Sequence, residues 1–219
     1  MHTLHAIAAG VATSLLSLSA AAQINCAAGA AGVNPVPVQV SNAAIPNSRV
    51  NPQINQRHIF CGEINAAGNA VGFHSRPAGH DPSLGNGPMA PLAARTVGAL
   101  VYIVPPGLNN PQPYRYMNNG VQVFNTVANA WQAKVGPSTF FPESCTQQEV
   151  VASIRYAYMH LQSAVTPPPV AAFYGPSAPY LNAPGYCVGE NGYPFTVSGY
   201  LNNIGGLWWV NTAFPIASF

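Results

Sequence analysis

One stretch of the chain, residues 147–163, has the apolar spacing of an amphipathic helix. Thr146 and Glu149 have the spacing of a capping box, in which each side chain satisfies a free backbone N–H of the other residue at a helix start. The apolar positions that fall on one face are Val150, Val151, Ile154, Tyr158 and Leu161. The prolines at 167–169 end the pattern, because proline cannot continue a helix. We therefore predict a helix over residues 147–163.

Shorter segments have the β-branched and aromatic content of strands. Residues 97–104 (VGALVYIV) predict a buried strand, and residues 120–125 (GVQVFN) predict a second one with partial alternation. Residues 195–201 and 207–214 predict a terminal hairpin, because the link NNIGG between them is rich in turn residues.

The N-terminal part has a different pattern. Residues 1–22 contain an apolar run and then small residues, which is typical of a signal peptide cleaved after Ala22. The run is shorter than the ~18 to 20 apolar residues of a membrane span, so we expect no membrane association after cleavage. Residues 23–53 predict an extended leader, in which prolines limit the alternation of Val36, Val38 and Val40 to an edge strand. The folded domain is expected from residue 54 to residue 219.

The composition is poor in charged residues and rich in hydrophobic ones, which limits the classes of protein that the chain can belong to. Charged residues make up 5% of the 219-residue chain, against about 25% in an ordinary soluble domain. Hydrophobic residues reach 48%, which excludes a highly charged disordered chain. The net charge of +2 is too small to indicate nucleic-acid binding by itself, since that normally requires a basic face.

Four cysteines lie after the predicted cleavage site: Cys26, Cys61, Cys145 and Cys187. An even number in an exported chain predicts two disulfides, with three pairings open. No two of them have the short spacing of a zinc site. The alternative is four buried free thiols in a reducing compartment.

Two histidines, His58 and His74, lie sixteen residues apart and flank a segment with glycines and asparagines. Neighbouring elements can bring such a pair together, and one ring can then take a proton while the other gives one. One alternative is that both rings are structural. A zinc site is less favoured, because no third ligand lies at a helical spacing.

Lys134 is the only lysine of the chain. In a protein whose surface avoids charge, this rarity favours a role such as stabilising the negative charge that builds on a phosphate in a transition state. The alternative is a lysine whose stem packs on the surface while its amine reaches water.

Other catalytic classes find less support. The motif G-x-S-x-G is absent and Asp81 is the only aspartate, which disfavours a Ser-His-Asp hydrolase. No phosphate-binding or dinucleotide fingerprint is present. A glycosidase needs two carboxylates. These would have to come from Glu63, Glu143, Glu149 and Glu190, of which capping accounts for Glu149.

Three blocks, in this order, resemble the bacterial branch of the EndoU-type endoribonucleases. They are residues 57–65 (RHIFCGEIN) with 70–75 (AVGFHS), Lys134 with residues 138–142 (STFFP), and Gly199-Tyr200 with residues 211–215 (NTAFP). The resemblance runs from about residue 54 to the C-terminus. It implies an α+β fold with an antiparallel sheet and few helices, which we expect the disulfides to stabilise.

The resemblance also implies a site. Its catalytic residues are His58, His74 and Lys134, and Thr212 and Phe214 bind the substrate. We expect His74 to act as general base on a ribose 2′-hydroxyl and His58 as general acid on the departing 5′-oxygen, although these two roles can be exchanged. Lys134 would face the non-bridging phosphate oxygens, Thr212 would bond the nucleobase edge, and Phe214 would stack on the base.

Two positions depart from the family pattern. Many members have Tyr where this chain has Phe214, so a hydroxyl is missing and the stacking face remains. Cys145 stands where relatives often have Trp. Neither change removes a proton-transfer group.

The sequence therefore predicts a secreted or periplasmic endoribonuclease that cleaves single-stranded RNA, with a uridine preference implied by the resemblance, and leaves 2′,3′-cyclic phosphate ends. RNA is the expected partner, and an immunity protein is a further candidate if the enzyme is a toxin rather than a scavenger of RNA. No cofactor is expected, and stimulation by a divalent metal stays open. The rival interpretations are a secreted binding module with structural histidines and a glycosidase that uses Glu63 or Glu190.

Overall fold

The computed structural model describes residues 23–29, 32–39, 46–87, 89–103, 115–161, 163–164 and 171–216. The predicted signal peptide, Val40 and the prolines at 167–169 lie outside these residues. None of the helices in the described part is long and apolar enough to cross a membrane.

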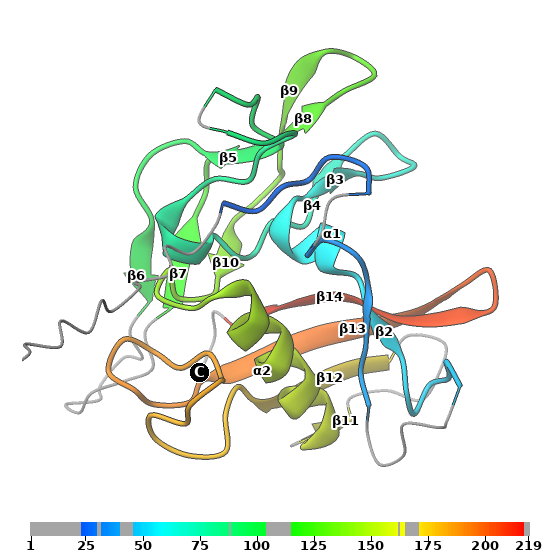
Figure 1. Cartoon of the computed structure of the whole chain (residues 1–219), viewed down its shortest axis with the longest axis vertical. Helices are drawn as coiled ribbons and strands as arrows, with labels where there is room; N and C mark the ends of the chain where they lie inside the picture. The colour runs from blue at the N-terminus through cyan, green and yellow to red at the C-terminus, as the bar shows by residue number, and fades with distance from the viewer. Residues whose placement is uncertain are drawn as a thin grey trace, which may run out of the picture.

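The largest element is a six-stranded sheet with the order β1-β2-β14-β13-β12-β11. Neighbouring strands are antiparallel, except that β14 and β2 run parallel. Its strands are β1 (Val36–Pro37), β2 (Gln53–Ile54), β11 (Ser163–Ala164), β12 (Ala171–Pro176), β13 (Thr196–Ile204) and β14 (Leu207–Pro215). Helix α2 (Gln147–Met159) lies across one face of this sheet over β12 and β13 (Figure 1).

The predicted helix and its capping box are confirmed, but its predicted end at residue 163 is wrong. Thr146 accepts from the backbone N–H of Glu149, and the Glu149 carboxylate accepts from the backbone N–H of Thr146. The helix ends at Met159 because His160 leaves the helical conformation, and residues 163–164 pair with β12 instead. Leu161 is therefore outside the helix and 46% exposed.

The predicted terminal hairpin is confirmed, and its strands are longer than expected. β13 and β14 pair through a turn at Gly205 and Gly206, both of which have a positive φ. The pairing shifts register near Tyr200. Beyond that irregularity, Ala213 and Pro215 are buried, so Thr212 and Phe214 project from the opposite face of β14.

Three small sheets form the other half of the molecule, in the upper and left parts of Figure 1. The first consists of β3 and β4. The other two have three strands each, in the orders β5-β8-β9 and β10-β7-β6. The bounds are β3 (Glu63–Ile64), β4 (Ala70–Val71), β5 (Ala94–Thr96), β6 (Val101–Ile103), β7 (Arg115–Asn118), β8 (Val121–Asn125), β9 (Ala130–Ala133) and β10 (Ser138–Phe140). Two further helices in the described part of the chain are short: α1 (Gln56–Phe60) and the 3-10 helix η1 (Pro77–Gly79). A separate small core lies here, around Phe73, Val121 and Phe140.

The expected strand over residues 97–104 is confirmed only as the short strand β6, its expected burial is wrong at Val97 and Val101, and Val104 lies outside the described residues. Strand β6 begins only at Val101, since Gly98 has φ +87° and interrupts the extended chain before it. Val97 and Val101 are 53% and 60% exposed. β6 is the edge strand of its sheet, so a run of apolar residues does not by itself indicate burial. The second expected strand is confirmed as β8, with Val121 and Val123 buried.

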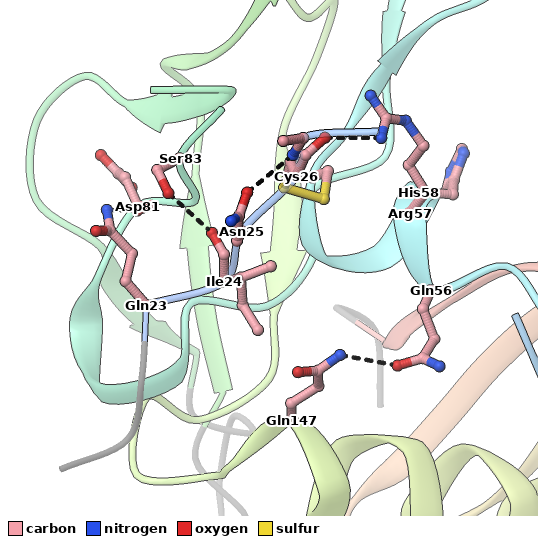
Figure 2. Close-up of a disulfide and its surroundings, with 12 residues drawn as sticks. Gln23, Ile24, Asn25, Cys26, Gln56, Arg57, His58, Asp81, Ser83 and Gln147 are labelled. Carbon is pink, nitrogen blue, oxygen red and sulfur yellow. Dashed lines mark hydrogen bonds between the residues drawn. A yellow bond between two sulfur atoms is a disulfide. The ribbon is translucent and has the colours of Figure 1, made fainter. Parts of the chain in front are cut away.

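The described part of residues 23–53 packs against the domain. Ile24, Cys26, Val33 and Val38 are buried in the large core. Both expected disulfides are present, and the pairs are Cys26–Cys61 and Cys145–Cys187. Figure 2 shows Cys26 beside α1, where the Arg57 guanidinium donates to its carbonyl oxygen at 2.8 Å. The α+β fold with antiparallel sheets, few helices and two disulfides is confirmed.

Candidate active site

His58 is held by helix α1. Asn55 caps this helix by accepting from the backbone N–H of His58 at 3.2 Å, and its amide nitrogen donates to Asn211 on β14 at 3.2 Å. His58 is a buried residue with 7% of its surface exposed. Nδ1 of its ring lies 2.7 Å from the Glu63 carboxylate. The hydrogen bond from His58 holds the pKa of Glu63 below its usual value. The ring therefore has a negatively charged partner at Nδ1, which leaves Nε2 for chemistry.

The backbone at residues 72–74 brings His74 beside α1. The N–H groups of Phe73 and His74 donate to the carbonyls of His58 and Ile59 at 2.8 and 2.7 Å. This path needs a positive φ at Gly72 (+74°) and at Phe73 (+62°), the second of which is unusual for a residue with a side chain. A Cβ at Gly72 would lie 2.2 Å from the His58 carbonyl oxygen, so only glycine fits.

The ring of His74 has a different partner. Its Nδ1 lies 2.9 Å from the carbonyl oxygen of Thr139. Because a carbonyl can only accept, Nδ1 carries the proton and Nε2 of the neutral ring keeps a free electron pair. Burial holds the pKa of His74 well below its usual range, and the positive charges of Lys134 and His58 lower it further. The ring is therefore neutral at physiological pH.

Lys134 follows β9, where it pairs with Ala70 in an isolated parallel bridge. Its amine donates to the carbonyl of Gly72 and to the hydroxyl of Ser138, both at 2.9 Å. An ammonium has three protons, so one donor remains for a ligand. Burial lowers the pKa of Lys134 to about 8.

The sequence analysis missed the role of Ser138. Its hydroxyl accepts from Lys134, donates to the carbonyl of Phe73 at 3.2 Å, and lies 3.2 Å from Nδ1 of His74. Glu63 was considered only as a glycosidase carboxylate, whereas it pairs with His58. Both residues lie in the sequence blocks that carry the family resemblance. Nothing in the pattern indicated which side chain each would contact.

The structure brings four of the five predicted site residues to one cavity of about 430 Å³. His58, His74, Lys134 and Phe214 line it. The ring centroids of the two histidines lie 6.1 Å apart, and the Phe214 ring stacks 5.2 Å from His74. Thr212 is not on the wall of the cavity, although it projects from the same face of β14 as Phe214. The cavity thus combines a neutral imidazole, an imidazole paired with a carboxylate, an ammonium and an aromatic face.

Three of the four glutamates considered for glycoside hydrolysis have other partners. Glu143 bonds Arg76 at 2.8 Å, Glu149 caps α2, and Glu63 pairs with His58. Among the residues that the structure describes, no group of three or more His, Cys, Asp or Glu side chains could hold a metal ion.

Comparison with known families identifies the family of this chain. The family model described as bacterial EndoU nuclease matches residues 52–217. This range includes all of the residues that line the cavity. Neither the curated proteins nor the solved structures gave a significant match.

Proposed function

The chain belongs to the bacterial EndoU nuclease family, and from this premise we propose that it is an endoribonuclease that cleaves single-stranded RNA by attack of a 2′-hydroxyl on the adjacent phosphate. The observation that carries the proposal is the pair of histidines 6.1 Å apart on a cavity that Lys134 also lines. Cleavage by this route needs a proton acceptor, a proton donor and a positive charge beside one phosphate, and no outside cofactor.

In the proposed reaction, Nε2 of His74 takes the proton of the 2′-hydroxyl. The 2′-oxygen then forms a bond to phosphorus, and the bond between phosphorus and the 5′-oxygen of the next nucleotide breaks. Nε2 of His58 gives that oxygen its proton, while the Glu63 carboxylate accepts a hydrogen bond from Nδ1–H and stabilises the positive ring before the transfer. The products end in a 2′,3′-cyclic phosphate and a 5′-hydroxyl.

The amine of Lys134 supports this reaction by stabilising the charge that grows on the non-bridging oxygens. Two of its protons are held by Gly72 and Ser138, which fixes the direction of the third. The Ser138 hydroxyl also lies against Nδ1 of His74. It therefore helps to fix the position of the Lys134 amine relative to the imidazole that is proposed as the base.

Base recognition is assigned to Phe214 and Thr212 on β14. The Phe214 ring supplies a stacking face at the cavity, and the hydroxyl of Thr212 is proposed to bond the edge of a uracil. We propose a uridine preference on this basis, together with the family resemblance.

We also propose that the enzyme acts outside the cytoplasm, in the periplasm or after secretion. The support is the signal-like pattern of residues 1–22 and two disulfides, which form and persist in oxidising compartments. A role as a toxin with an immunity protein, or as a scavenger of RNA, fits such a location.

The test is incubation of the mature protein with a uridine-containing oligoribonucleotide, with and without EDTA. We expect cleavage at uridines in both samples. A pure, folded protein that leaves the oligonucleotide intact under all metal conditions would favour the alternative of a binding module with structural histidines.

A further inference from the structure

A second cavity, of about 360 Å³, is lined by residues of the same helix, α1, and the same strand, β14, as the candidate active site. Arg57 and Asn55 line it from α1 and its cap, and Trp209 lines it from β14. The next residue after Arg57 is His58, whose ring faces the catalytic cavity. Asn55 caps the helix that carries His58 and also bonds Asn211, which lies between Trp209 and Phe214. The two cavities therefore share the same short helix and the same strand.

We propose that this second cavity binds a nucleotide of the RNA substrate within about five positions of the cleaved one, with Trp209 stacking on its base and Arg57 contacting its phosphate. This inference rests on the function proposed above. The chemistry fits single-stranded RNA, which proteins hold by aromatic faces and by positive charges along the backbone. Arg57 is exposed and Trp209 is half-buried, so both are open to a ligand.

The position of Trp209 on β14 connects the two cavities. Val210 and Ala213 are both fully buried in the large core, and the register shift lies between them. Trp209 therefore projects from the face opposite the core, as Phe214 does. Five residues of strand separate the two rings, or roughly 16 Å at about 3.3 Å per residue. Stacked nucleotides rise about 3.4 Å each, so a segment of at most about five nucleotides spans this distance.

The other wall of the cavity comes from the leader. Ala27, Val33 and Pro35 line it, and all three lie outside residues 52–217, which the family model matches. The Cys26–Cys61 disulfide and the bond from Arg57 to the Cys26 carbonyl attach this wall to α1 (Figure 2). The subsite is thus a feature that the leader adds to the nuclease domain.

The readout is the length advantage, defined as kcat/KM for an oligonucleotide of about eight residues divided by kcat/KM for a uridine-containing dinucleotide. A stacked base contributes roughly 5- to 150-fold. We expect a length advantage of about this size in the wild type, and a value near one in Trp209→Ala. Trp209→Phe should recover part of it, because a smaller stacking face remains. Oligonucleotides extended on the 5′ side and on the 3′ side identify which flank is bound.

The matched control is Trp131→Ala. Trp131 lies on β9, where the Arg95 guanidinium of β5 stacks on its ring, and it does not line the second cavity. Its loss should leave the length advantage intact. Arg57→Gln should lower the slope of log KM against log salt by about one for the long substrate, as expected for one lost phosphate contact. Arg95→Gln removes the same charge elsewhere and should not change that slope.

The outcomes separate the two proposals. A wild-type protein that cleaves neither substrate contradicts the proposed function itself. A wild type that cleaves both substrates equally well, or a Trp209→Ala variant that keeps the full length advantage, contradicts the subsite alone. If Trp209→Ala fails to fold, Trp209→Phe and Arg57→Gln decide, and an unchanged length advantage and salt slope in these folded variants overturn the inference.

Discussion

The surroundings of His58 and of His74 differ in kind, although the two rings lie 6.1 Å apart. His58 lies on a helix and has a carboxylate at Nδ1, whereas His74 lies in a strained loop and has only a main-chain carbonyl and a hydroxyl there. A carboxylate stabilises a positive ring, while burial favours a neutral one. The difference supports our proposal that His58 acts as the general acid and His74 as the general base.

Removing either ring is expected to have the largest effect on RNA cleavage. The two variants should differ in how their activity depends on the leaving group. His58→Ala and His74→Ala should each reduce RNA cleavage by roughly 10²- to 10⁴-fold. On a uridine 3′-(4-nitrophenyl phosphate), the leaving group needs no proton, so His58→Ala should lose much less while His74→Ala loses as much as before. Steady-state rates on the two substrates measure this.

Glu63→Gln tests the contribution of the carboxylate that pairs with His58. It should slow RNA cleavage by about 10-fold or more, because a charged hydrogen bond to His58 is lost. The nitrophenyl substrate should be affected little. Equal losses on both substrates for His58→Ala and Glu63→Gln would mean that the acid and base roles are exchanged.

Lys134→Ala is expected to reduce the rate by roughly 100- to 1000-fold, since such electrostatic contacts contribute about 3 to 4 kcal/mol to the transition state. Lys134→Arg should recover part of the rate because it keeps the charge. Lys134→Met fills a similar volume without charge, and its melting temperature separates packing from electrostatics. An Ala variant with near wild-type cleavage would remove Lys134 from the mechanism.

The pH dependence of kcat/KM should reflect the protonation states of His74 and of Lys134. His74 must be neutral, and its pKa lies well below 6.5, so activity should persist as pH falls below 6.5. Lys134 must be protonated, and its pKa is about 8, so activity should decrease as pH rises through that value. In Lys134→Arg the part of the alkaline loss that comes from Lys134 should disappear. An acidic loss centred above pH 6.5 would contradict the assignment of His74 as the buried base.

The smallest effect is expected at Phe214. Phe214→Tyr should be tolerated or slightly faster, since the ring keeps its stacking position beside His74. Phe214→Ala should reduce cleavage by roughly 5-fold or more and weaken the preference for uridine. If the Ala variant equals the wild type in rate and base preference, β14 does not contribute to the site.

The elements that could be predicted from the sequence are those with local signals. The capping box of Thr146 and Glu149 determines the start of α2, and the Gly205-Gly206 turn determines the last hairpin. The end of α2 was missed because strand pairing of residues 163–164 competes with the helix. The strand over residues 97–104 was misjudged because hydrophobicity does not tell whether another layer covers a strand.

The members of the candidate site were found through the family blocks, but their arrangement was not predictable. His74 reaches His58 only through the positive φ of Gly72 and Phe73 and through bonds to the carbonyls of α1. The bonds of Ser138 to Lys134 and His74 depend on the same local path. No hydrophobic period encodes such a turn, so the partners of each ring come from the structure.

The measurement that tests the central claim most directly is cleavage of an oligoribonucleotide that contains one uridine, compared with the same oligonucleotide carrying 2′-deoxyuridine at that position. We predict that the first is cut to a 2′,3′-cyclic phosphate and a 5′-hydroxyl, and that the second is not cut at that position, because the attacking oxygen is missing. Continued cutting at the deoxyuridine would contradict a reaction in which the 2′-hydroxyl is the nucleophile.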